Sequence, residues 1–111
     1  MLDPGKLNRR ITIQSPSTER DISGTPKKSW SDVLTTWASI RAATSREVYA
    51  VASFVSTLSH VITIRYRSGV TITHAMQVLY AGRKFEIQAV SDPDEGREQL
   101  QLLCLELNDG K

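Results

Sequence analysis

Few side chains in this 111-residue sequence could act as a nucleophile, a base or a metal ligand. The two histidines, His60 and His74, are not spaced as HxH or HxxxH, the patterns that bring two imidazoles to one metal ion. The single cysteine, Cys104, stands among leucines, and such surroundings raise the pKa of a thiol and suppress the reactive thiolate. We therefore expect two ordinary strand histidines and a small core cysteine.

An acidic run is the remaining candidate for a metal site. Asp92, Asp94 and Glu95 bring three carboxylates together, but they lack the register of a calcium-binding loop, and Pro93 restricts the backbone. A solvated turn is the simpler interpretation. The sequence also contains no GxGxxG, GxxxxGK[ST] or GxSxG motif. We expect no metal, no cofactor and no enzymatic activity.

Basic residues suggest a different chemistry, contact with nucleic acid. Arg65 and Arg67 share one face of an expected strand, and Arg83 and Lys84 begin a later one, so these four are a candidate basic patch. Charges at strand edges also serve merely to discourage aggregation. Fourteen basic residues against twelve acidic ones leave a net charge of +2, which is too small to predict strong binding to nucleic acid or an anionic membrane.

The composition is that of one compact globular domain over residues 1–111, with 40% hydrophobic and 23% charged residues. A single cysteine excludes an internal disulfide framework and favours a reducing compartment. The N-terminus lacks the apolar core of a secretion signal. The longest stretch without charged residues, 48–64, is too polar to cross a membrane. We expect neither export nor membrane insertion.

Alternating apolar and polar residues predict about six short strands, joined late in the chain by tight turns at 68–69 and 81–82. The last strand is apolar on both faces, so we expect both to be covered. The fold class is mainly β, a small antiparallel β-barrel or rolled sandwich with one short helix and a long loop in the N-terminal half. The expected strands are 9–14, 33–43, 58–67, 70–80 with a possible break at 74–75, 83–91 and 100–107.

Two other segments position candidate functional residues. Thr44 to Glu47 matches a capping box, which predicts a helix that ends near Phe54 and carries an apolar stripe. Residues 15–32 are rich in Ser, Thr, Pro and Lys, which predicts a long loop available for contacts. We expect flexibility in this loop and at 1–8 and 108–111.

Nine short motifs are spread in order along nearly the whole chain. They are Gly5-Lys6-Leu7, 10–14, Trp30, Trp37-Ala38, Glu47, 64–67, 80–87, 92–94 and 102–106. In order and spacing this series resembles the head–tail joining proteins of tailed bacteriophages, also called head-completion or stopper proteins. Gln77 stands where the resemblance leads us to expect an arginine, so a basic contact at that position is not carried over.

The resemblance implies a virion protein of the head–tail connector, assembled in the cytoplasm of a bacterial host. It implies a small β-barrel that forms a ring with itself beneath the portal of a DNA-filled capsid. Its partners would be a portal-side adaptor protein, a tail-side protein and double-stranded DNA, which passes through the ring without sequence-specific contacts. The ring would join head to tail and help to retain the packaged DNA.

By the same resemblance, residues 44–57 are the candidate channel segment and residues 15–32 the candidate partner-contact loop. The candidate channel residues are Thr44, Ser45, Arg46, Glu47 and Tyr49, and the candidate contact residues are Lys27, Lys28 and Trp30. The two roles could be exchanged between the segments, and the helix could instead pack on its own barrel. The competing function is that of a monomeric SH3-like or OB-like barrel that binds nucleic acid or peptide.

Overall fold

Six strands and one short helix make up the part of the chain that the computed structural model describes, which is 7–20, 24, 26–53, 55, 57–66, 69–91 and 98–107. For 18–20 and 26–28 only the backbone is described. The elements are β1 (Arg9–Arg20), β2 (Pro26–Ala42), α1 (Ser45–Ala50), β3 (His60–Arg65), β4 (Gln77–Tyr80), β5 (Arg83–Ser91) and β6 (Gln99–Leu107).

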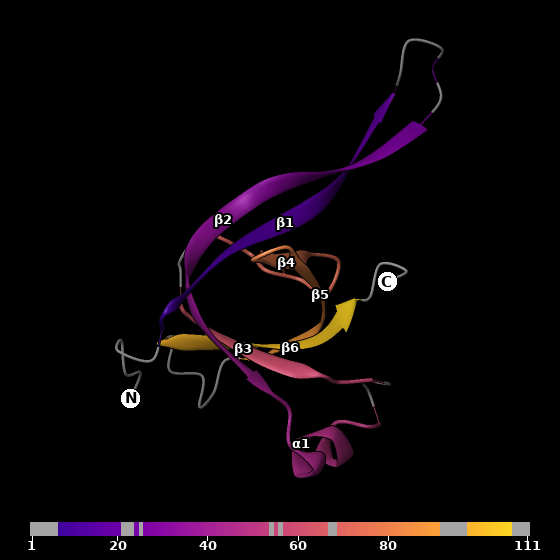
Figure 1. Ribbon diagram of the computed structural model, residues 1–111. Coiled ribbons are helices and arrows are strands. Elements are labelled where there is room, and N and C mark those ends of the chain that lie inside the picture. The colour runs from indigo at the N-terminus through magenta and orange to yellow at the C-terminus, as the bar shows by residue number, and fades with distance from the viewer. Residues whose placement is uncertain are drawn as a thin grey trace.

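The strands close into a barrel in the order β1-β2-β3-β6-β5-β4, and every neighbouring pair is antiparallel (Figure 1). The predicted fold class is confirmed, and the closed barrel replaces the rolled sandwich that the sequence also allowed. Closure gives each strand of the barrel wall a partner on both sides, so the wall has no free edge.

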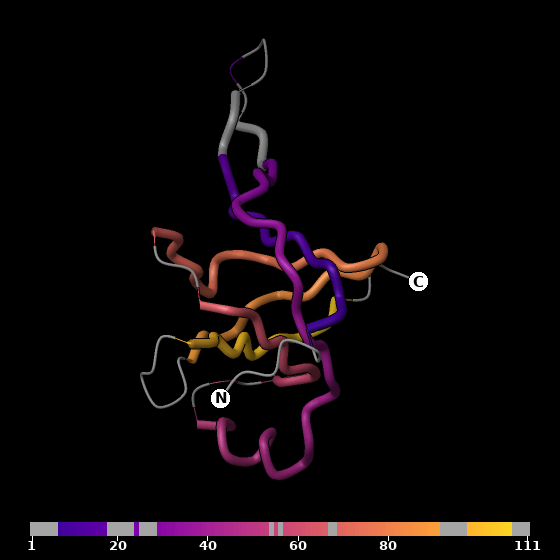
Figure 2. Tube along the Cα trace, turned by 90° about the vertical axis from the view of Figure 1, so that its left-hand side faces the viewer, coloured from indigo at the N-terminus to yellow at the C-terminus, as the bar shows by residue number. Residues whose placement is uncertain are grey.

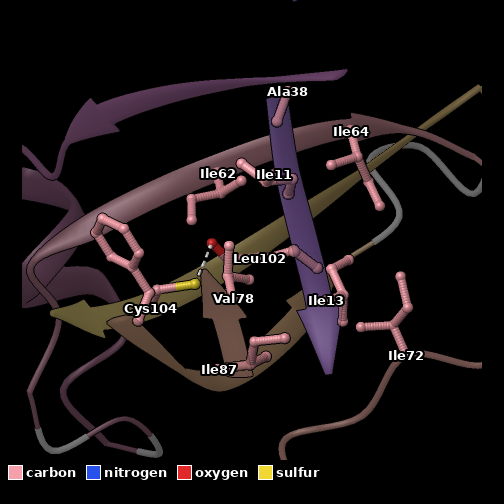
Figure 3. Close-up of a cluster of buried hydrophobic side chains, with 11 residues drawn as sticks. Ile11, Ile13, Ala38, Ile62, Ile64, Ile72, Val78, Ile87, Leu102 and Cys104 are labelled. Atoms are coloured by element: carbon pink, nitrogen blue, oxygen red, sulfur yellow. Dashed lines mark hydrogen bonds between the residues drawn. The ribbon is translucent and has the colours of Figure 1, made fainter. Parts of the chain in front are cut away.

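The core fills the barrel interior, because each strand contributes alternate apolar residues to it. Phe85, the largest fully buried side chain, lies among isoleucines from β1, β3 and β5. The core residues are Ile11, Ile13, Ala38, Ile62, Ile64, Ile72, Val78, Phe85, Ile87, Leu102 and Cys104 (Figure 3). No helix in the described part is long and apolar enough to span a bilayer.

The loop predicted at 15–32 is wrong, because β1 and β2 continue through it as a paired hairpin. We call residues 15–20 and 26–31 the arm, which extends away from the barrel in both views (Figures 1 and 2). The molecule consequently measures 51 × 29 × 25 Å. Proline is compatible with these strands because beyond the barrel each has a free outer side. The two strands of the arm carry no alternating apolar residues, and serine hydroxyls instead meet across them, with Ser17 Oγ 2.8 Å from Ser29 Oγ.

The strand predicted at 70–80 is also shorter than expected, since β4 includes only Gln77–Tyr80. The preceding residues turn instead, with the Met76 amide donating to the Thr73 carbonyl at 3.1 Å and the Ala75 amide donating to Thr73 Oγ1 at 3.3 Å. Such side-chain bonds compete with strand pairing. His74 lies exposed in this turn and not in a strand.

The turn predicted at residues 81–82 is confirmed, because Ala81 and Gly82 join β4 to β5 with φ angles of 50° and 83°. Positive φ at both central positions is the mark of a type I′ hairpin turn. This turn fixes the register of the β4–β5 hairpin, in which Tyr80 pairs with Arg83.

Candidate functional site

The residues that could do chemistry are not gathered into a metal site anywhere in the described ranges. Cys104 is fully buried, its thiol donates to the Leu102 carbonyl at 3.4 Å, and burial raises the pKa of the thiol to about 12. The interpretation of Cys104 as a core residue is therefore confirmed. The acidic run 92–95 lies outside the described residues.

A serine, a histidine and a glutamate meet at one end of the barrel, a set that sequence reasoning missed. His60 Nδ1 lies 3.0 Å from Ser59 Oγ, and His60 Nε2 lies 3.9 Å from Glu106 Oε1. The Ser59 hydroxyl also accepts from the Glu106 amide at 2.7 Å and donates to the Cys104 carbonyl at 3.3 Å. Because this hydroxyl bridges two backbone groups of β6, we interpret the set as a structural clasp between β3 and β6.

Arg83 completes this clasp. Its guanidinium makes two hydrogen bonds to the Glu106 carboxylate, at 2.8 and 3.0 Å, and lies 5.0 Å from the centre of the Phe85 ring. The hydrogen bonds from Arg83 hold the pKa of Glu106 below its usual value. Arg83 therefore fastens β5 to β6 and is not free to bind a polyanion. No sequence signal could pair residues 83 and 106, because their contact depends on strand register.

The predicted basic patch is not formed by the described residues. Arg65 pairs with Gln99 at the start of β6, whereas Lys84 pairs with Leu107 at the end of the same strand. Eight residues of strand separate these positions by about 27 Å. Arg67, the fourth candidate, lies outside the described residues.

The predicted helix cap is confirmed and is tied to the barrel. Thr44 Oγ1 accepts from the Glu47 amide at 3.2 Å, and Glu47 Oε1 accepts from the Thr44 amide at 2.9 Å. Arg41, at the end of β2, donates to both carboxylate oxygens of Glu47, at 2.7 and 2.6 Å. These bonds, those from Arg41 first, lower the pKa of Glu47 to about 2. A single carboxylate thus caps α1 and anchors it to β2.

The helix ends at Ala50, earlier than predicted, and buries none of its residues. Tyr49 is 84% exposed, and Ser45 and Arg46 are exposed too. Helix packing on the barrel, one of the two alternatives from the sequence, is therefore wrong for α1. The expected apolar stripe is divided, because Val48 is exposed whereas Val55 is buried.

The segment after α1 does pack on the barrel. Val61 points outward, since its neighbours His60 and Ile62 point inward, yet it is only 1% exposed. Val55 and Leu58 are buried as well, so this segment forms a small apolar cluster outside the main core. A groove of about 430 Å³ separates α1 from the outer face of β5 and β6. Its lining is Glu47, Ala50, Val51, Leu58, Ala89, Val90, Ser91, Gln101 and Leu103.

The arm carries the other predicted contact residues. Trp30 is 38% exposed and pairs with Pro16 across the two strands. Lys27 and Lys28 pair with Glu19 and Thr18 along the backbone, and their side chains lie outside the described part. The arm and α1 project from opposite sides of the barrel, as both views show (Figures 1 and 2).

Two residues of the barrel, one on its surface and one buried, were not anticipated in the places where they lie. Trp37 is 49% exposed on the outer face of β2, with the Arg10 guanidinium 5.3 Å from its ring centre. A large aromatic residue on the polar face of the predicted strand 33–43 was the available signal. Gln77, where an arginine was expected, is buried and donates to Gln14 Oε1 at 2.9 Å. It joins β4 to β1.

The chain is similar to proteins of known family along nearly its whole length. The model of the phage head completion protein family matches residues 2–107. The chain is 24% identical over 106 residues to head completion protein gp7 of Enterobacteria phage HK97, covering 93% of this chain and 95% of gp7.

Solved structures share the barrel. Protein SF1141 from Shigella flexneri 2a has a TM-score of 0.77 and 31% identity, covering 97% of this chain and 99% of SF1141. A chain of the native gene transfer agent virion has a TM-score of 0.62, covering 91% of this chain and 96% of its own. At 22% identity, this second likeness is one of fold alone.

Proposed function

The chain belongs to the phage head completion protein family, and on that premise we propose that it forms a ring at the head–tail connector that joins the DNA-filled capsid to the tail. The observation that carries the proposal is the placement of two projections, the arm and α1, on opposite sides of one closed barrel (Figure 1). A protein that bridges two neighbours along an axis needs a contact element on each side. The matched gp7 is itself a head completion protein.

We further propose that α1 reaches the channel at one end of the ring, and that the arm contacts the adaptor or the tail at the other end. Thr44 and Glu47 would hold the base of α1, whereas Ser45, Arg46 and Tyr49 are exposed and would be the residues that approach DNA. The net charge of +2 suits a channel through which DNA must pass, because every phosphate held firmly would oppose its movement. Trp30 would be the anchor of the arm.

The test of head completion is a null allele in the phage or prophage that encodes the chain, complemented from a plasmid. The proposal predicts free full-length tails beside emptied or tailless heads, and normal virions on complementation. Normal virions without the gene would overturn it and favour the monomeric binding barrel.

The test of the channel assignment uses Arg46→Glu, with Trp30→Ala as the matched change in the arm. Retention of DNA should fall in Arg46→Glu heads that still contain the protein, while Trp30→Ala should lower attachment of the tail or adaptor. The reversed pattern of defects would exchange the two roles.

A further inference from the structure

Two faces of the barrel point in opposite directions. In the closed order β1-β2-β3-β6-β5-β4, strands β2 and β5 are three steps apart whichever way the barrel is followed. Figure 1 shows β2 on the left and β5 on the right of the barrel wall, with the arm above and α1 below. The groove beside α1 is lined by residues 89–91 of β5, so the outer face at the start of β5, near Glu86, and the outer face of β2 near Trp37 lie away from both projections.

The β2 face has a basic rim around an exposed aromatic ring. The Arg10 guanidinium lies over the Trp37 ring. Ala38 of β2 pairs with Ile64 of β3, and because the two strands are antiparallel, the next residue of β3, Arg65, lies beside Trp37. Both arginines are exposed, and neither forms an ion pair within the described ranges. Tryptophan and arginine are the residue types that most often dominate binding at protein interfaces.

The β5 face combines two half-buried leucines of the neighbouring strand β6 with two exposed charged residues of β5, Lys84 and Glu86. Leu105 and Leu107 alternate with the buried Cys104 and so point outward, half-buried, next to Glu86 and Lys84 in the strand register. Glu86 accepts a hydrogen bond from Gln88 but forms no ion pair in the part of the chain that is described. The sequence predicted that both faces of β6 would be covered. Leu103 lines the groove beside α1 together with Leu58, whereas Leu105 and Leu107 lie outside that lining.

We propose that the β2 face of one copy docks on the β5 face of the next, with Trp37 against Leu105 and Leu107 and the flanking arginines toward Glu86. The inference rests on the proposed ring and names its interface. Two different faces on opposite sides make a heterologous contact, the kind that closes into a ring.

The first test is a disulfide between copies. We expect Trp37→Cys combined with Leu105→Cys in one chain to give a ladder of oligomers on a non-reducing gel when assembled particles are oxidised. Each single variant should stay monomeric on the gel, because Cys104 is buried. The matched control is Trp37→Cys with Tyr49→Cys, which pairs the same face with the exposed α1 residue and should give no ladder.

A double-cysteine protein that enters particles and yet stays monomeric would overturn the interface and leave head completion standing. If the wild-type protein is absent from particles, or the null allele gives normal virions, the proposed function fails with it. These outcomes are scored on the same preparations, so the two failures are distinguishable.

The second test exchanges charges across the interface. Arg10→Glu with Arg65→Glu places carboxylates against Glu86, and we expect tailed particles to fall about tenfold or more, since like charges across an interface are strongly unfavourable. Adding Glu86→Arg should restore assembly. Both arginines are exposed and form no ion pair in the described part, and the exposed contact of Arg10 with Trp37 is weak, so thermal unfolding of the isolated variant should lie close to wild type. Unchanged particle numbers, or no rescue in a folded triple variant, would contradict the proposal.

Discussion

The Glu47→Ala variant tests whether α1 is held by one carboxylate. A helix of six residues with no buried side chain is not stable by itself. The change removes the capping contact with Thr44 and the ion pair with Arg41. In that ion pair the Arg41 side chain is 47% exposed and the Glu47 side chain is 33% exposed. A cap contributes about 1 kcal/mol and an exposed ion pair up to about 1 kcal/mol. Opening of α1 should thus become easier by about 2 kcal/mol, or about thirtyfold.

Amide hydrogen exchange followed by NMR measures this opening. The Val48 amide donates to Thr44 and the Val51 amide to Glu47, so both should exchange about thirtyfold faster, or without protection. Barrel amides such as that of Ile62 should be unchanged. The matched control is Arg46→Ala, which alters an exposed residue of the same helix without a hydrogen bond or ion pair in the described part. Unchanged exchange of the Val48 and Val51 amides in Glu47→Ala, or an equal loss of protection in the control, would show that the Glu47 carboxylate does not hold α1.

Three further predictions concern acid stability, thiol chemistry and the core. Folding lowers the pKa values of Glu47 and Glu106, so the stability that these ionised carboxylates contribute is complete above the unfolded pKa near 4.5 and is lost as the pH falls below it, toward about 2 for Glu47. Urea titrations should therefore show a lower free energy of unfolding at pH 3 than at pH 6, with a smaller difference in Glu47→Gln. A wild-type free energy of unfolding that does not depend on pH would contradict this. Cys104 should resist a thiol reagent until the protein unfolds, and rapid native labelling would show that the barrel opens. Phe85→Ala should lower the free energy of unfolding by about 3–5 kcal/mol in the same titrations; a loss below 1 kcal/mol would mean that Phe85 is not central to the core.

Residue alternation predicted the barrel strands because each has one face in the core. Ile11 and Ile13 in β1 and Phe85 and Ile87 in β5 are all buried, as their spacing indicated. The capping box at Thr44 and the turn at 81–82 were predictable for a second reason, because each depends only on residues that are close together in the sequence. Local patterns thus sufficed wherever local geometry decides the structure.

The arm could not be predicted, because neither of its faces enters a core. Its strands pair through backbone bonds and serine hydroxyls, such as those of Ser17 and Ser29, and this composition is also typical of loops. The clasp of Ser59 and Glu106 was hidden for a different reason. It depends on the register of β3 against β6, which only the closed barrel determines.

In the proposed ring between head and tail, the arm and α1 of each copy are directed to opposite sides along the channel axis. Electron cryomicroscopy of the head–tail junction in intact particles measures this directly. We expect a ring of six-stranded barrels, each with its arm toward one neighbouring layer and α1 on the other side. A junction without such a ring, or barrels with the arm and α1 in the same layer, would contradict it.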